Sequence, residues 1–147
     1  MRPVSYVEGL ATTNYYPNGF VEMDFIPELA HRLYERRDQA IVVPCGDCSS
    51  ADFQPVEQDC HGNVEVWCKA HPGHKPVRGW LVFERYSRPG FCRFIAHSVV
   101  EDEQGQLFDP TPTRASRRHP FVRDESVEEE FLLMLAARQL VHLDHCP

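Results

Sequence analysis

Residues 91–112, FCRFIAHSVVEDEQGQLFDPTP, constrain the fold more than any other stretch of the chain. The first ten of these residues are rich in β-branched and aromatic side chains, which is typical of a strand. A polar turn centred on Gly105 follows, and residues 106–109 begin a second strand. We therefore expect a hairpin with His97 on its first strand and Asp109 at the end of its second, twelve residues later. Taken alone, the pattern favours an ordinary hairpin with a half-exposed histidine and an Asp-Pro-Thr-Pro turn.

A cysteine upstream of the hairpin gives the His97–Asp109 pair a second interpretation. Residues 60–68 are expected to form one or two helical turns that begin near Cys60. A cysteine at a helix N-terminus lies against unpaired N–H groups and the positive end of the helix dipole, and both favour the thiolate. A carboxylate bonded to an imidazole fixes the ring as a catalytic base requires. The alternative for Cys60 is a small buried apolar side chain.

The 147 residues predict one domain with a single core. We divide it into an N-terminal wrap at 1–58, which holds a helix and a Cys-x-x-Cys motif, a core site region at 59–125 and a C-terminal helix at 126–141. The predicted class is α+β. An antiparallel sheet of about three to five strands is expected to pack against the Cys-bearing helix and the C-terminal helix.

Several shorter elements complete this expectation. Helical spacing of apolar residues predicts an amphipathic helix over 25–38, and the main strands are expected at 79–86, 91–101 and 106–109. Residues 144–147 are expected to form a tail.

The charge of the chain limits its partners. A net charge of −7 argues against general binding to nucleic acid or to an anionic membrane. The first twenty residues lack the apolar core of a signal peptide, and no window is long enough to span a membrane, so we expect a cytoplasmic protein. A basic stretch with Arg114, Arg117 and Arg118 is expected to be a solvated loop, with a clamp for a carboxylate or phosphate as the sharper alternative.

Four residues have the types and spacing of a zinc site. Cys45 and Cys48 form a Cys-x-x-Cys knuckle, and Cys68 and His71 form a second pair after 19 intervening residues. A reducing compartment favours thiols or metal sites over disulfides for such cysteines. We therefore consider a structural zinc ion, against the alternative of scattered buried thiols and exposed histidines. A redox role is less favoured because no thioredoxin-like βαβ pattern surrounds the motif.

Four short motifs between residues 60 and 112 together resemble a known pattern. They are CHGNV at 60–64, GW at 79–80, AHSVV at 96–100 and GQLFDPTP at 105–112. A group of small bacterial and phage proteins has a similar order of Cys-x-x-Asn, Gly-(Trp or Tyr), His and Asp-x-Thr. That group resembles a minimal papain-like or transglutaminase-like cysteine fold, in which a helix carrying Cys packs on a sheet carrying His and an acidic or amide residue.

The resemblance implies roles for four residues. Cys60 would be the nucleophile, His97 the base and Asp109 the orienting carboxylate. Gln54, six residues before the cysteine, would help to bind the oxyanion, with Gln58 as a second candidate. This hypothesis describes a cysteine-dependent hydrolase or acyltransferase that needs no cofactor for catalysis and acts on an amide or ester bond of a peptide, a protein or a small molecule. The competing hypothesis is a zinc-stabilised, non-catalytic binding module that uses Cys45, Cys48, Cys68 and His71.

Overall fold

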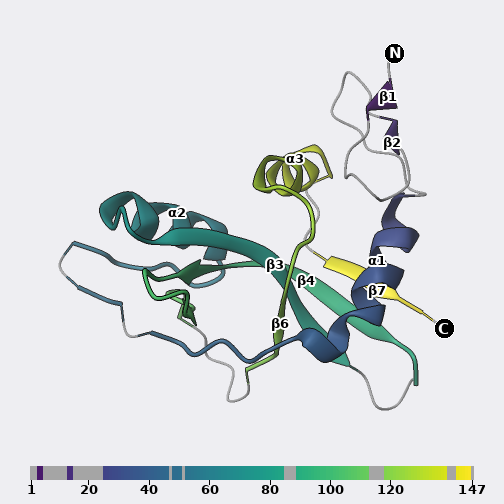
Figure 1. Cartoon of the computed structure of the whole chain (residues 1–147), viewed down its shortest axis with the longest axis horizontal. Coiled ribbons are helices and arrows are strands. Elements are labelled where there is room, and N and C mark those ends of the chain that lie inside the picture. Colours follow the sequence, from purple (N-terminus) through teal and green to yellow (C-terminus); the bar gives the residue numbers. More distant parts are fainter. Residues whose placement is uncertain are drawn as a thin grey trace.

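Two long strands, β3 (Lys75–Glu84) and β4 (Cys92–Glu101), lie at the centre of the fold and pair antiparallel along their whole length (Figure 1). In this register Gly79 lies directly opposite His97. The computed structural model describes residues 3–4, 13–14, 25–46, 48–50, 52–84, 89–112, 118–138 and 142–146. Successive side chains of both strands point to opposite faces of the sheet, and apolar residues of each strand pack on both faces.

Three short strands extend this pair into a five-stranded sheet with the order β5-β4-β3-β6 and with β7 also beside β4. β6 (Phe121–Arg123) pairs with β3, while β5 (Leu107–Phe108) and β7 (His142–His145) share the other edge of β4. All of these pairings are antiparallel, so the predicted α+β class and antiparallel sheet are confirmed. The expected tail at 144–147 is wrong for its first residues, because a leucine at 143 is buried in the core and draws this segment into β7.

The shared edge of β4 has a gap that matters for the site. β7 pairs with residues 92–95 and β5 pairs with residues 100 and 101. Among the described strands, none pairs with residues 96–99 on this edge. His97 and Ser98 lie in this gap, and helix α2 (Cys60–Ala70) packs against β4.

One face of the sheet carries the main core. Helices α1 (Phe25–Glu35) and α3 (Glu128–Arg138) cover it, and apolar side chains of both helices meet those of four strands. Its largest fully buried side chains are Leu33, Trp80, Phe94, Phe131, Met134 and Leu143. Burying one large apolar side chain stabilises the folded state by about 1.5–3 kcal/mol. The larger of the two apolar clusters lies on this face, which therefore supplies most of the stabilisation from apolar burial.

The opposite face is covered by extended chain rather than by a helix. Residues 41–46, which follow α1 and the short 3-10 helix η1 (Arg37–Gln39), run across this face (Figure 1). Isolated bridges join Ile41 to Phe121 and Cys45 to Asp109. Val43 is buried there in a second apolar cluster with Val77, Val99 and Phe121.

The Cys-bearing helix α2 is longer than expected. Its eleven residues form about three turns rather than the one or two predicted. Val64, in its second turn, is completely buried. Asp59 is its N-cap, and the Asp59 carboxylate accepts a hydrogen bond from the backbone of Gly62. A Cβ atom at Gly62 would lie 2.4 Å from this carboxylate, so glycine leaves the room that the cap requires.

Other boundaries differ by a few residues. The helix predicted at 25–38 ends at Glu35 and continues as η1, and α3 occupies 128–138 of the predicted 126–141. Of the predicted N-terminal wrap before residue 25, only the ladder of β1 (Pro3–Val4) with β2 (Thr13–Asn14) is described. Within the described residues, no helix has the length and apolar character needed to cross a membrane.

Candidate active site

The structure brings together Cys60, His97 and Asp109. His97 Nε2 lies 2.6 Å from Asp109 Oδ2, a short hydrogen bond between strand β4 and the residue after β5. This bond leaves the other ring nitrogen, Nδ1, for the Cys60 sulfur, to which His97 also hydrogen-bonds. The three side chains come from three segments of the chain: Cys60 begins α2, His97 lies on β4, and Asp109 directly follows β5.

The ionisation of this group favours a thiolate beside an imidazolium. Burial raises the pKa of Cys60, but hydrogen bonds to His61 and His97 and the charge of both rings lower it from 9.0 to about 6. Burial lowers the pKa of His97, but hydrogen bonds to Asp109 and Cys60 and their charges raise it from 6.5 to about 9. At neutral pH the sulfur is therefore charged, as a nucleophile requires.

Asp109 has further partners that keep it ionised. Its Oδ1 accepts from the Thr111 backbone at 3.0 Å, and its Oδ2 accepts from Arg118 Nη2 at 3.1 Å. Burial raises the pKa of Asp109, but the bonds to His97, Thr111 and Arg118 hold it below its ordinary 3.8. Arg118 also donates to the Val43 carbonyl at 3.0 Å. The expectation of a solvated loop is therefore wrong for Arg118, because two acceptors hold it, while Arg114 and Arg117 lie outside the described residues.

The Asn and Thr of the sequence pattern have a structural role. Asn63 is buried, and its amide bonds both backbone groups of Val56 and the Thr111 hydroxyl. Asn63 lies one turn after Cys60, and Thr111 lies two residues after Asp109. This contact therefore ties the cysteine-bearing helix to the segment that carries the carboxylate.

The Gly of the Gly-Trp motif makes room behind the imidazole. A Cβ atom at Gly79 would lie 2.2 Å from the Val122 carbonyl oxygen and 2.5 Å from the Phe121 ring. Phe121 in turn packs edge-to-face against His97, with 6.4 Å between ring centroids. Gly79 thus allows β6 to approach β3 closely, so that the Phe121 ring packs against His97.

Gln54 is not brought to this group by any contact within the described residues. Its side chain is exposed and its amide donates to the Ser50 carbonyl, a bond within the same loop. Its role in binding an oxyanion stays a prediction. Gln58, the second candidate, is exposed and has a positive φ of 64°.

The four residues considered for zinc do not gather into one cluster. Among the described residues, no group of three or more His, Cys, Asp or Glu side chains could hold a metal ion. Cys45 is exposed, with its sulfur 3.8 Å from the Thr111 carbonyl oxygen. His71 stacks on Trp67 at 3.9 Å and Cys68 is half-buried. The donor atoms are of the types that bind zinc. A bound zinc ion stays a prediction, which direct metal analysis can test.

Sequence reasoning missed His61, which contacts the reactive group, and Ser98, which bonds to His61. His61 hydrogen-bonds to the Cys60 sulfur, and its Nδ1 lies 2.6 Å from Ser98 Oγ. Ser98 is completely buried although it is polar. The sequence indicates them only by position, because His61 directly follows Cys60 and Ser98 directly follows His97. If α2 begins beside β4, these two polar side chains meet.

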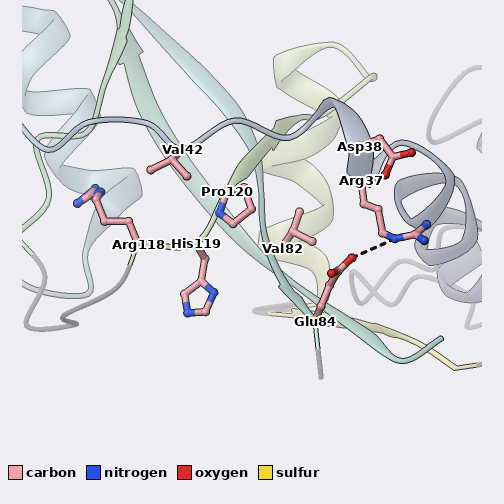
Figure 2. Close-up of a pocket in the computed structure, with 8 residues that line it drawn as sticks. All are labelled: Arg37, Asp38, Val42, Val82, Glu84, Arg118, His119 and Pro120. Carbon is pink, nitrogen blue, oxygen red and sulfur yellow. Dashed lines mark hydrogen bonds and ion pairs between the residues drawn. The ribbon is translucent and has the colours of Figure 1, made fainter. Parts of the chain in front are cut away.

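A pocket of about 480 Å³ has Arg118 at one end of its lining (Figure 2). Its lining includes Arg118, His119 and the ion pair of Arg37 with Glu84 at 3.0 Å. Neither Cys60 nor His97 is among its lining residues, but Arg118, which lines it, also bonds Asp109.

No protein-family description, no curated protein and no solved structure matches the chain. The geometry of Cys60, His97 and Asp109 therefore carries the functional argument by itself.

Proposed function

We propose that this protein is a cysteine-dependent hydrolase or acyltransferase that acts on an amide or ester bond through Cys60, His97 and Asp109. One observation carries the proposal: an imidazole is held by a buried carboxylate at 2.6 Å and contacts a sulfur at the start of a helix. This is the arrangement of nucleophile, base and orienting group that acyl transfer by a thiol requires.

We further infer a papain-like or transglutaminase-like core. The support is the placement of a cysteine at the start of α2 against an antiparallel sheet, with histidine and aspartate following in chain order on β4 and after β5. Fold alone does not select the reaction, so the substrate class rests on the chemistry of the site.

The first half of the proposed reaction acylates the enzyme. The Cys60 thiolate attacks the carbonyl carbon and forms a C–S bond, while the carbonyl π electrons move to oxygen. The tetrahedral intermediate then collapses, and the bond to the leaving nitrogen or oxygen breaks. The leaving group takes the proton from His97, which becomes neutral.

The second half releases the acyl group. Water or an acceptor amine attacks the thioester as neutral His97 takes its proton. The C–S bond breaks and returns the thiolate beside the imidazolium. The net reaction is hydrolysis with water, or acyl transfer with an amine. Asp109 keeps its charge throughout, because it stabilises the imidazolium and fixes the ring orientation.

Two donors are proposed for the oxyanion: the Cys60 backbone N–H at the start of α2, and the amide of Gln54. The first is supported by its position at a helix N-terminus. The second requires the Gln54 side chain to leave its present partner in the 50–54 loop.

Selective alkylation tests the proposed function. Cys92 is the internal control, because it is fully buried and its pKa is raised to about 11 by burial and by Glu84. Iodoacetamide at neutral pH should modify Cys60 first, as mapped by mass spectrometry, and His97→Ala should slow that modification by roughly tenfold or more. Modification of Cys60 no faster than Cys92, or equal rates with and without His97, would contradict the proposal.

A further inference from the structure

A second imidazole contacts the reactive sulfur. His61 hydrogen-bonds to Cys60 from the first turn of α2, while His97 reaches the same sulfur from β4. The proposed reaction uses only His97 as a proton carrier. His61 thus has no assigned role, although it contacts the reacting atom.

Buried hydrogen bonds fix the orientation of the His61 ring. Its Nδ1 lies 2.6 Å from Ser98 Oγ, and Arg78 Nη1 donates to that oxygen at 2.8 Å. A guanidinium cannot accept a hydrogen bond, so Ser98 Oγ is the acceptor from Arg78. The Ser98 contact occupies Nδ1 of His61 and leaves Nε2 as the ring nitrogen for the sulfur. A thiolate only accepts hydrogen bonds, so Nε2 must carry a hydrogen to bond it.

Arg78 and Phe131 hold the His61 ring and its partner Ser98 in position. Arg78 is buried and forms ion pairs with Glu65 of α2 and, at 2.8 Å, with Glu128 of α3. The His61 ring also packs edge-to-face on Phe131, with 6.1 Å between centroids.

The other charged groups that face the sulfur belong to the site already described. His97 contacts the sulfur directly, and Asp109 with Arg118 lies behind it. The Asp59 cap lies at the start of the same helix. The Arg78 network and the Asp109 network therefore approach Cys60 through different histidines.

We propose that His61 is a catalytic residue whose Nε2–H group donates a hydrogen bond, first to the Cys60 thiolate and then to the oxyanion of the tetrahedral intermediate. In this division of labour, His97 moves the proton and His61 is a fixed hydrogen-bond donor. Ser98 and Arg78 are positioning residues, since they act through the His61 ring. The inference rests on the proposed acyl transfer and names the oxyanion donor for that reaction.

Two reagents separate this role from simple activation of the thiol. Iodoacetamide alkylates a thiolate without forming an oxyanion, whereas p-nitrophenyl acetate acylates it through a tetrahedral oxyanion. Both rates are measured from pH 5 to pH 10 on the full chain, with the rates of Cys60→Ser subtracted. His61→Phe keeps an aromatic ring but has no donor, and His61→Gln restores one. His31→Phe, at an exposed position of α1, is the matched control.

The expected result is a selective loss of acylation. Removal of one oxyanion donor lowers such rates by roughly 10²-fold, so His61→Phe should reduce the limiting acylation rate by about that factor. The limiting alkylation rate at high pH should change much less. His61→Gln should recover part of the loss, and His31→Phe should match the unmodified protein. Ser98→Ala, which removes the partner of Nδ1, should show a smaller loss of the same kind.

Equal changes in both limiting rates, or no change in His61→Phe and Ser98→Ala, would overturn the role of His61. The two proposals remain distinguishable. If His97→Ala abolishes acylation and the His61 variants do not alter it, only the His61 assignment fails. If the unmodified protein shows no Cys60-dependent acylation, the proposed function fails, and the His61 assignment fails with it.

Discussion

Asn63 and Thr111 share a buried hydrogen bond of 3.0 Å, although 48 residues separate them in the chain. Asn63 follows the proposed nucleophile by three residues and Thr111 follows the proposed carboxylate by two. The bond therefore fixes the distance between α2 and the segment after β5, on which the approach of Cys60 to His97 depends.

We predict that Asn63→Ala destabilises the protein by about 2–4 kcal/mol, because it leaves both backbone groups of Val56 without their amide partner. Thr111→Val should cost only about 1 kcal/mol, since it removes one of the three bonds and keeps the shape of the side chain. Urea unfolding at neutral pH measures both values. A cost for Asn63→Ala no larger than that for Thr111→Val would contradict this assignment.

Gly79→Ala should destabilise the protein by about 1–3 kcal/mol, because the added methyl group meets the Val122 carbonyl and the Phe121 ring. The variant should also slow alkylation of Cys60, since Phe121 packs against His97. Gly105→Ala is the matched control. It has open space around it and only the strain of a φ of +80°, so it should cost about 1 kcal/mol and leave alkylation unchanged. The idea fails if the two variants lower stability and alkylation equally.

The pH dependence of stability should report Asp109. Its pKa is held below 3.8 in the folded protein, so its contribution is fully present above 3.8 and is lost as the pH falls through the lower, folded value. Asp109→Asn removes this contribution. The difference in unfolding free energy between the two proteins should be constant near pH 5 and shrink as the pH falls below about 4. A difference that does not shrink in acid would mean that the carboxylate is not held ionised.

Metal analysis tests the predicted structural zinc. If Cys45, Cys48, Cys68 and His71 bind zinc, the purified protein contains one zinc ion per chain and Cys45→Ser loses it. Folded protein without metal would remove the site. Neither result decides the Cys60 proposal, which depends on Cys60, His97 and Asp109 and is tested by the alkylation of Cys60.

The main strands and the His97–Asp109 geometry could be predicted because they depend on local patterns. Alternating β-branched and aromatic residues indicate β3 and β4, and a hairpin of known length brings His97 near Asp109. The prediction that Cys60 lies near His97 rests on a resemblance in sequence, because no local pattern specifies how α2 packs on β4.

The contacts that the sequence did not predict are long-range. β7 depends on Leu143 reaching a core formed by α1 and α3, and the segment 41–46 depends on isolated bridges to Phe121 and Asp109. The basic stretch around Arg118 predicts a solvated loop. Instead, Arg118 bonds Val43 and Asp109, which lie 75 and 9 positions away in the sequence. His61 and Ser98 contact each other only when α2 and β4 are already in place.

Direct titration of the Cys60 thiolate tests the central claim. The ultraviolet absorbance of thiolate is followed with pH in the unmodified protein and in His97→Ala, with Cys60→Ser as the blank for the other cysteines. The account predicts a midpoint at about 6 in the unmodified protein and a clear upward shift in His97→Ala. A midpoint near the ordinary value of 9.0 in the unmodified protein, unchanged by His97→Ala, would contradict it.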